Sequence, residues 1–269
     1  MSRMLFLLFF SPLFSVFPQP TTEEAGHKDK IRFNQGEILE FDLGYAWFTL
    51  GKADLKISDE LHNYNDTPCY KVDISGRTTG ILGVVSGVDD SWGGYVDTYS
   101  GLPMFAYADL NEGKYHRKEE ILYDYDRDTV KIDMIKKHTK RPTKYYSIKE
   151  EMYDLISGYL KIRNLDYAGM KVGDTIRFDA FYDEVYYDFG LIYDGIEVIK
   201  TDVGKLRAHR IIPIIPENKI FPDLTPITAW ISADQNQLPL KVEAKMFFGH
   251  AFVELTGYKN IKYGPDFRK

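Results

Sequence analysis

Residues 238–258 carry the plainest structural signal in this sequence, and they read LPLKVEAKMFFGHAFVELTGY. On either side of Gly249 and His250, apolar and polar residues alternate with the two-residue period of a β-strand that buries one face. Two such runs joined by a short turn indicate a β-hairpin. The sequence therefore predicts two long antiparallel strands, 238–248 and 251–258, with their turn at Gly249 and His250.

The same alternation recurs along most of the chain, in segments separated by short turns rich in Gly, Asp and Asn. In residues 51–57, for example, Ala53, Leu55 and Ile57 fall on one face. Further strand-like segments are 38–45, 68–75, 91–97, 103–108, 115–123, 129–135, 175–182, 185–193, 196–200, 205–212 and 227–232. Strands at such spacing are typical of an antiparallel sandwich or barrel. We expect a mostly β protein.

One segment departs from this pattern. In residues 149–164 the apolar side chains fall at 152, 155, 156 and 159, which is the spacing of an amphipathic helix. Ser147 is a candidate N-cap, with Glu150 completing a capping box. Gly158 weakens the middle of a helix by roughly 1 kcal/mol relative to Ala, which indicates a close contact there. We expect one helix, with a curved sheet wrapped around it.

The first residues have the layout of an export signal. A short start with Arg3 precedes an almost wholly apolar run at 4–17, and this order is typical of a secretory signal peptide. The run is shorter than the roughly 20 apolar residues of a membrane-spanning helix. We expect a signal peptide over 1–18, a flexible segment over 19–30 and a single β-rich domain over 31–263, with no integral membrane segment after cleavage. A buried N-terminal helix is the alternative.

The charge and the cysteine content narrow the class of protein. With 34 Lys and Arg against 40 Asp and Glu, the formal charge of −6 argues against nucleic acid as a partner. Cys69 is the only cysteine, so the chain has no internal disulfide and its core alone must stabilise it. The strand-like neighbours of Cys69 favour a small buried side chain over a reactive thiol.

Sequence motifs of enzymes and metal sites do not occur. There is no Gly-x-Ser-x-Gly, His-Glu-x-x-His, Walker or dinucleotide-binding motif. The six histidines, at 27, 62, 116, 138, 209 and 250, do not pair at ligand spacing. We therefore expect no enzyme activity, no catalytic residue, no metal site and no cofactor.

Residues 88–97, VDDSWGGYVD, form the most unusual stretch. Trp92 and Tyr95 are candidate ligand-binding residues, because aromatic rings offer a large apolar face to a ligand. The carboxylates of Asp89, Asp90 and Asp97 are of the type that binds calcium or acts as an acid–base pair, so an envelope hydrolase is a further hypothesis. Asp beside Gly is also what a tight turn requires, and the turn is the simpler interpretation.

Two further segments stand out, one for its positive charge and one for its aromatic rings. Residues 136–144, KKHTKRPTK, are basic within an acidic chain and are suited to anionic lipid or polysaccharide. Residues 181–188, FYDEVYYD, would display rings for stacking against a sugar or a peptide. A solvated loop for the first and a hairpin with tyrosine edges for the second are the simpler interpretations.

Several blocks along the chain resemble a known family, the domain of unknown function 3108 family of exported bacterial proteins. The blocks are 33–41 (FNQGEILEF), 68–72 (PCYKV), 88–97 with Leu102 and Pro103, 153–160 (YDLISGYL) and 230–239 (WISADQNQLP). The resemblance implies a location in the bacterial envelope and a barrel-like or half-barrel architecture. Because the family has no established activity, it implies no catalytic residues.

These observations lead to two hypotheses of function. The first is a non-enzymatic protein in the periplasm of a Gram-negative bacterium that binds a lipid, another apolar ligand or a partner segment in the concave face of its sheet. The alternative is a structural or assembly factor at the outer membrane that acts through protein contacts. The first predicts that an apolar ligand binds the purified protein, and the second predicts co-purification of a specific partner protein.

Overall fold

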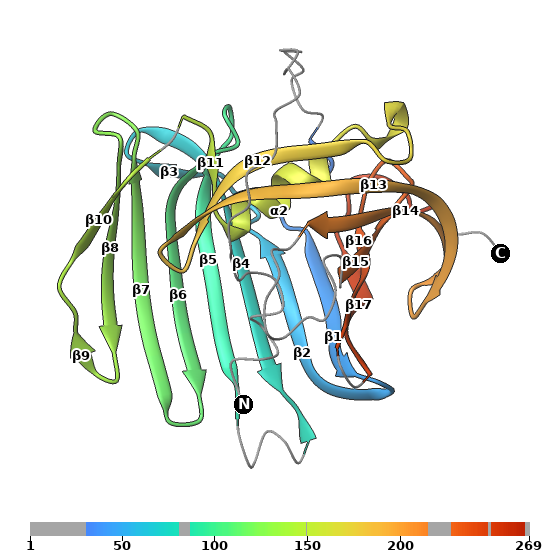
Figure 1. Ribbon diagram of the computed structural model, residues 1–269, viewed down its shortest axis with the longest axis horizontal. Coiled ribbons are helices and arrows are strands. Elements are labelled where there is room, and N and C mark those ends of the chain that lie inside the picture. Colours follow the sequence, from blue (N-terminus) through green and yellow to red (C-terminus); the bar gives the residue numbers. More distant parts are fainter. Residues whose placement is uncertain (1–30, 81–86, 149, 215–226, 247–248, 267–269) are drawn as a thin grey trace.

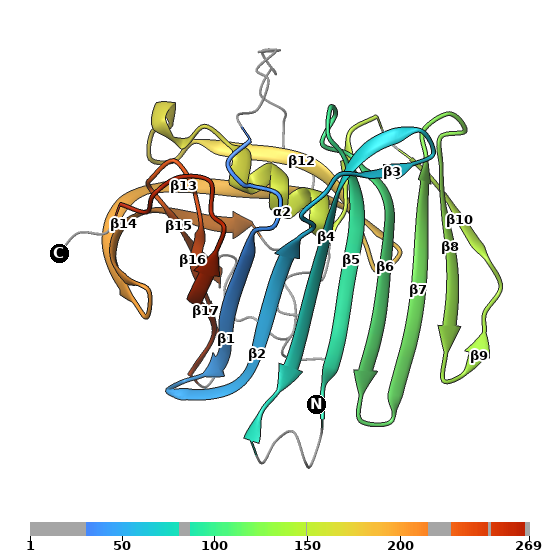
Figure 2. The same ribbon diagram turned by 180° about the vertical axis from the view of Figure 1, so that it is seen from behind.

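The computed structural model describes residues 31–80, 87–148, 150–214, 227–246 and 249–266. In this part the chain forms one strongly curved sheet of 17 strands and one α-helix, and Figures 1 and 2 show the helix inside the curve. The expected mostly β fold, with a sheet curved around one helix, is confirmed. The predicted signal peptide (1–18) and flexible segment (19–30) lie outside the described residues. Within the described ranges, no helix combines the length and the apolar character needed to cross a bilayer.

Most strands agree with the alternation of the sequence. The first half of the chain forms β1 (Ile38–Tyr45), β2 (Phe48–Ile57), β3 (His62–Tyr64), β4 (Thr67–Thr78), β5 (Asp89–Asp97), β6 (Pro103–Glu112), β7 (Tyr115–Asp124) and β8 (Thr129–Lys136). The rest forms β9 (Thr139–Lys140), β10 (Lys144–Ser147), β11 (Met152–Tyr153), α2 (Leu155–Asn164), the 3-10 helix η3 (Tyr167–Gly169), β12 (Thr175–Tyr182), β13 (Val185–Thr201), β14 (Gly204–Ile214), β15 (Ile227–Ser232), β16 (Pro239–Lys245) and β17 (His250–Lys259). Strands β1, β12 and β15 begin and end at the predicted residues.

Neighbouring strands are antiparallel along almost the whole sheet. Starting from β10, the order is β8, β7, β6, β5, β4, β2, β1, β17, β16, β15, β14, β13 and β12. Strand β11 pairs with β12 in parallel, and the short β3 and β9 lie beside β4 and β8. The sheet thus has two ends, one at β10 and one at β11 and β12.

The concave side of the sheet is filled by α2. Ile156 and Leu160 project from the helix into a core that contains side chains of β1, β2, β4, β5, β14, β16 and β17. On β5, a Cβ added to Gly94 would lie 3.6 Å from the side chain of Ile156, so helix and sheet are in direct contact. Since full burial of one such aliphatic side chain contributes roughly 1.5–3 kcal/mol, the helix is the centre of the hydrophobic core.

The helix begins later than predicted. It spans Leu155–Asn164 rather than 149–164, and its N-cap is Asp154 instead of Ser147, which lies in β10. Asp154 Oδ1 accepts a hydrogen bond from Ser157 N at 2.7 Å, and Ser157 Oγ accepts one from Asp154 N at 2.9 Å, so these two residues form the capping box. The residues just upstream form β11, whose two side chains are both buried. For Met152 and Tyr153, the apolar spacing therefore predicted burial correctly, but it predicted a helix where the structure has a strand.

The predicted contact at Gly158 and the predicted position of the turn within 238–258 need correction, whereas the burial of Cys69 is confirmed. A close contact at Gly158 is not found, because a Cβ there would meet its nearest neighbours at 3.8 Å, an ordinary distance. The hairpin of 238–258 is confirmed as β16–β17, but Lys245 pairs with His250, so His250 begins β17 and the turn lies earlier. Cys69 is fully buried, as expected, and burial raises the pKa of its thiol to about 11.

A buried polar network fixes the end of α2 to the start of β1. Arg163 (1% exposed) forms a bidentate ion pair with Glu37 (0% exposed). Arg163 Nε also donates to the carbonyl oxygen of Asn236 at 3.1 Å. Gln237 Nε2 donates to the carbonyl oxygens of Arg163 at 2.6 Å and Leu165 at 2.9 Å. The two bonds from Gln237 satisfy carbonyl groups at the end of α2 that a helix leaves without partners.

Candidate functional site

The two ends of the sheet meet along a line that we call the seam, with β8 and β10 on one side and the β12–β13 hairpin on the other. Among the described strands, β10 pairs with β8, and β12 pairs with β11 and β13, so side chains rather than ladder hydrogen bonds join the ends. The rings of Tyr146 and Phe181 lie 5.3 Å apart across the seam. Tyr186 Oη donates to the carbonyl oxygen of Ser147 at 2.6 Å.

The turn between β12 and β13 brings two carboxylates to the seam. Asp183 and Glu184 both have positive φ (46° and 67°), as a type I′ hairpin turn requires. Each meets a cation from the opposite side: Arg117 on β7 donates to Asp183 at 2.6 Å, and Lys144 on β10 pairs with Glu184. Tyr146 Oη also donates to Glu184 at 2.6 Å. The hairpin turn is therefore held by charge-assisted hydrogen bonds, which are stronger than neutral ones.

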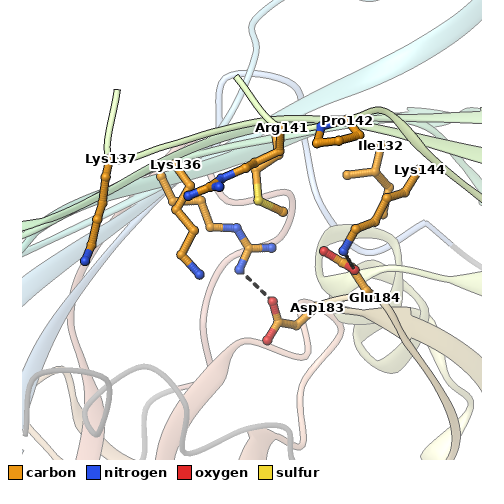
Figure 3. Close-up of a pocket in the computed structure, with 10 residues that line it drawn as sticks. Ile132, Lys136, Lys137, Arg141, Pro142, Lys144, Asp183 and Glu184 are labelled. Carbon is orange, nitrogen blue, oxygen red and sulfur yellow. Dashed lines mark hydrogen bonds and ion pairs between the residues drawn. The ribbon is translucent and has the colours of Figure 1, made fainter. Parts of the chain in front are cut away.

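A pocket of about 560 Å³ opens beside this turn (Figure 3). Its apolar lining consists of Ile132, Met134 and Pro142, and its charged lining consists of Arg117, Lys136, Lys137, Arg141, Lys144, Asp183 and Glu184. Five cationic side chains thus face two carboxylates. The volume lies within the range of small-molecule sites, about 300–1,000 Å³, and the excess of positive charge favours an anion.

Arg117 is the buried cation of the pocket. Besides Asp183, it contacts Glu119 through a hydrogen bond of 2.5 Å, and both side chains of this second pair are buried. Although burial disfavours the charged guanidinium, the two carboxylates keep the pKa of Arg117 raised. Burial also raises the pKa of Glu119, and the guanidinium offsets part of this effect. Arg117 Nε and Glu119 Oε1 are buried without a hydrogen bond to a described residue. Because the guanidinium of Arg117 pairs with both Glu119 and Asp183, it is held in one position and keeps its charge.

Three further cations lie on the wall formed by the end of β8 and the segment after it. Figure 3 shows Lys136, Lys137 and Arg141 extending from this wall. Lys136 Nζ lies 5.5 Å from the centre of the Tyr115 ring. Lys137 and Arg141 are exposed, and neither forms an ion pair with a side chain in the described ranges. Their ammonium and guanidinium groups are thus available to carboxylate or phosphate oxygens.

The structure does not bring Trp92 and Tyr95 into this pocket, nor does it bring them together. Successive residues of a strand point to opposite faces, so the two rings lie on opposite sides of β5. Trp92 is buried on the face of Val96, which belongs to the core around α2. Tyr95 contacts the rings of Tyr64 and Phe105, with centroids 5.5 and 6.2 Å away. Their assignment as ligand-binding residues stays a prediction. Because the rings lie on opposite faces of β5, each would have to contact a ligand on a different face of the sheet.

The carboxylates of residues 88–97 are not gathered into one site. Asp89 and Asp97 lie at opposite ends of β5. Asp97 accepts hydrogen bonds from Tyr99 N at 2.9 Å and from Ser100 Oγ at 2.6 Å, so it stabilises the β5–β6 turn, as the simpler interpretation expects. The stretch itself forms strand β5 rather than a turn, so the turn interpretation is wrong for Asp89 and Asp90. Asp90 is buried, and burial raises its pKa to about 6. His27 lies outside the described residues, and within them no three His, Cys, Asp or Glu side chains are grouped to hold a metal ion.

The two charged segments that the sequence singled out separately meet at the seam. Residues 136–144 supply one wall of the pocket, and residues 181–188 supply the turn opposite. Arg117 was missed, although a signal exists: Arg117 and Glu119 share a face of β7 with Tyr123, which is buried. An Arg and a Glu two residues apart on the buried face of a strand indicate an internal ion pair.

Comparisons with known proteins identify one family and several solved structures to which this chain is similar. The family profile described as "Protein of unknown function (DUF3108)" matches residues 40–256. No curated protein matches the chain significantly. A crystal structure of a β-barrel-like protein of the domain of unknown function DUF1849 from Brucella abortus is 7% identical with a TM-score of 0.53, covering 87% of this chain and all (100%) of that one. A hypothetical protein from Chlamydia trachomatis is 8% identical with a TM-score of 0.34, covering 88% of this chain and 92% of that chain.

At 7% identity, the Brucella structure shows similarity of fold alone. The family profile is more specific, because it begins within β1 and ends within β17 and so includes both sides of the seam. The resemblance noted in the sequence is thereby confirmed. This chain belongs to the DUF3108 family of proteins of unknown function.

Proposed function

We propose that the protein is an exported, non-catalytic binding protein of the bacterial envelope, and that its ligand is an amphiphilic anion held at the seam pocket. The observation that carries the proposal is the charge of the pocket, where five cationic side chains face two carboxylates in about 560 Å³. The apolar side chains of Ile132 and Met134 beside these cations suit a short hydrocarbon segment.

The proposal changes the position and chemistry of the ligand expected from the sequence. The concave face of the sheet was expected to hold an apolar ligand, but Ile156 and Leu160 of α2 pack into the core there. The pocket at the seam has charged walls instead, and a wholly apolar ligand would leave Lys137 and Arg141 without a partner. An anionic headgroup, carboxylate or phosphate, pairs with them and places its hydrocarbon part on the apolar side chains.

The residues of the pocket support binding rather than catalysis. Lys and Arg side chains supply charge and hydrogen-bond donors, and Arg117 keeps its proton because of its two carboxylate partners. A role as an assembly factor at the outer membrane, the alternative function, would instead require a protein partner that covers this surface, and it predicts co-purification of that partner.

The test is a titration by calorimetry with octyl phosphate below its micelle concentration. We expect binding of octyl phosphate, weaker binding of inorganic phosphate, which lacks the alkyl chain, and little binding of octanol, which lacks the charge. Replacement of both Lys137 and Arg141 with Ala should weaken binding of octyl phosphate by about tenfold or more, since a hydrogen bond to a charged group contributes about 1.5–3 kcal/mol.

The matched control is Lys140→Ala, which removes an exposed lysine of β9 that does not line the pocket. This variant should bind octyl phosphate as the unaltered chain does. The proposal is wrong if octyl phosphate does not bind, or if the Lys137→Ala/Arg141→Ala variant binds it with unchanged affinity.

A further inference from the structure

The tip of the β1–β2 hairpin exposes two adjacent aromatic rings. Trp47 is 83% exposed and Phe48 is 59% exposed, and their ring centroids lie 5.4 Å apart. Tyr45 pairs with Phe48, so the two residues between them, Ala46 and Trp47, form the turn itself. Among the large apolar side chains exposed in the described part of the chain, these two are neighbours at a single protruding point.

The composition of this turn departs from ordinary turn chemistry. Residues 45–51 read YAWFTLG and contain no charged side chain. Ala46 has a φ of 55°, in the left-handed region where a hairpin turn usually carries Gly, Asn or Asp. A sequence that breaks local rules without a gain in packing is typical of a functional surface. Neither solubility nor turn formation explains the two rings.

The rings are held on a rigid base. Ala46 N donates to the carbonyl oxygen of His250 at 2.8 Å, which ties the turn to β17. Tyr45 packs against a small cluster of buried residues from β15, β16 and β17, namely Ile227, Ala244 and Ala251. The backbone that carries Trp47 and Phe48 is therefore held in place before any partner arrives, which lowers the entropy cost of binding.

The charges near the tip are suited to a lipid headgroup region. The carboxylate of Asp42 is already occupied by Lys52 at 2.9 Å and by Thr49 Oγ1 at 3.3 Å, so it would not stand unpaired against the membrane. Lys245 lies exposed on β16, which pairs with β17 and is therefore two strands away from β1. A hairpin tip that carries aromatic rings and no charged side chain matches the interface of a bilayer, where Trp is favoured.

We propose that Trp47 and Phe48 insert into the interfacial region of a lipid bilayer and attach the protein to a membrane surface. A convex tip needs no complementary groove in a soft bilayer, whereas a protein partner would have to supply one. Figure 1 also shows the β1–β2 and β8–β9 turns at the same lower edge of the sheet, so the edge that bears Lys137 faces the same way as the tip. The inference rests on the exposed rings and does not require the seam pocket to bind an anion.

Tryptophan fluorescence can report on this contact directly. The chain has three tryptophans; Trp92 is buried, and Trp230 Nε1 donates to Glu197 at 2.7 Å. Trp47 is the most exposed of them, so a change on binding to the membrane would come mainly from this ring. With vesicles of phosphatidylcholine, we expect the emission of the purified full chain to shift to shorter wavelength and to be quenched by lipids brominated near the headgroup end of their acyl chains.

Sedimentation with the same vesicles tests the residues. The variant Trp47→Ser/Phe48→Ser should partition into the lipid about a hundredfold more weakly, since burial of each large apolar side chain is worth at least a factor of about ten. The control is Tyr99→Ser, which removes an aromatic ring that is 90% exposed at the opposite end of the sheet, on the β5–β6 turn. This control should partition as the unaltered chain does.

Three results would overturn the proposal. The first is emission of the unaltered chain that vesicles neither shift nor quench, a measurement that does not depend on the folding of any variant. The second is equal partitioning of the Trp47→Ser/Phe48→Ser variant and the Tyr99→Ser control. The third is a blue shift that appears with rising protein concentration in the absence of lipid, because a second copy of the chain would then be the occupant of the tip.

Discussion

Replacement of Arg117 with Met tests whether the seam depends on a buried guanidinium. Met keeps much of the length of the side chain and removes the charge, so Glu119 loses its partner while it remains buried. The cost has an upper limit, because the carboxyl can take up a proton. Neutralising a Glu with an ordinary pKa of about 4.3 costs about 3.7 kcal/mol at about pH 7. We therefore expect the free energy of unfolding to fall by about 3 kcal/mol and by no more than about 3.7 kcal/mol, within the range for breaking a buried ion pair.

The pH dependence of this loss follows from the same reasoning. In the folded variant Glu119 is protonated, with a raised pKa, whereas in the unfolded chain it ionises above its ordinary pKa. The folded state then binds the extra proton, so the penalty grows as pH rises and shrinks as pH falls. It should decrease by about 1.4 kcal/mol for each pH unit, to about 1 kcal/mol at about pH 5.

The assay is urea unfolding of the Arg117→Met variant and the unaltered chain at both pH values. The double variant Arg117→Met/Glu119→Leu is the matched control, because it removes both charges and should recover the stability of the unaltered chain to within about 1 kcal/mol. A loss that does not change with pH, or a double variant no more stable than the single one, would refute this view of the seam.

Three other expectations can be checked by the same unfolding experiments. Glu37→Ala leaves the buried Arg163 guanidinium without its carboxylate and should cost about 3–5 kcal/mol, whereas Arg177→Ala at the exposed pair with Asp188 should cost at most about 1 kcal/mol; similar losses for the two would contradict the assigned burial. Burial lowers the pKa of His209 to about 4, so the unfolded state binds its proton more readily and stability should fall as pH drops from about 6.5 to about 4. The variant His209→Gln should show a shallower decline in melting temperature over that window, and an unchanged decline would exclude His209 as its cause. Gly158→Ala should raise stability by about 0.5–1 kcal/mol, because Ala favours the helix and the added Cβ meets only ordinary contacts; a loss would show that the helix is packed more tightly there.

The strands were predictable because each buries one face and so leaves a two-residue period in the sequence. In β2, Ala53, Leu55 and Ile57 are all buried, as their spacing predicts. The start of the helix was not predictable from apolar spacing, since the two buried residues of β11 continue the pattern of α2. Only the capping box of Asp154 and Ser157 marks the boundary.

The site was predictable only in its parts. The basic segment 136–144 and the acidic turn in 181–188 each stood out, but nothing local to either indicates that they meet. Their contact depends on the curvature of the whole sheet, which brings Lys144 to Glu184, a separation of 40 residues along the chain. Trp47 and Phe48 were overlooked for a different reason, since they lie between the predicted strands 38–45 and 51–57, in residues to which no role was assigned.

A crystal structure of the protein grown with octyl phosphate would show directly whether the seam is the binding site. We expect the phosphate group within hydrogen-bond distance of Arg141, on the cationic wall, with the alkyl chain against Ile132 and Met134. An octyl phosphate bound beside Trp92 or Tyr95, or a seam pocket that stays empty at saturating ligand, would contradict the assignment of the seam as an anion-binding site.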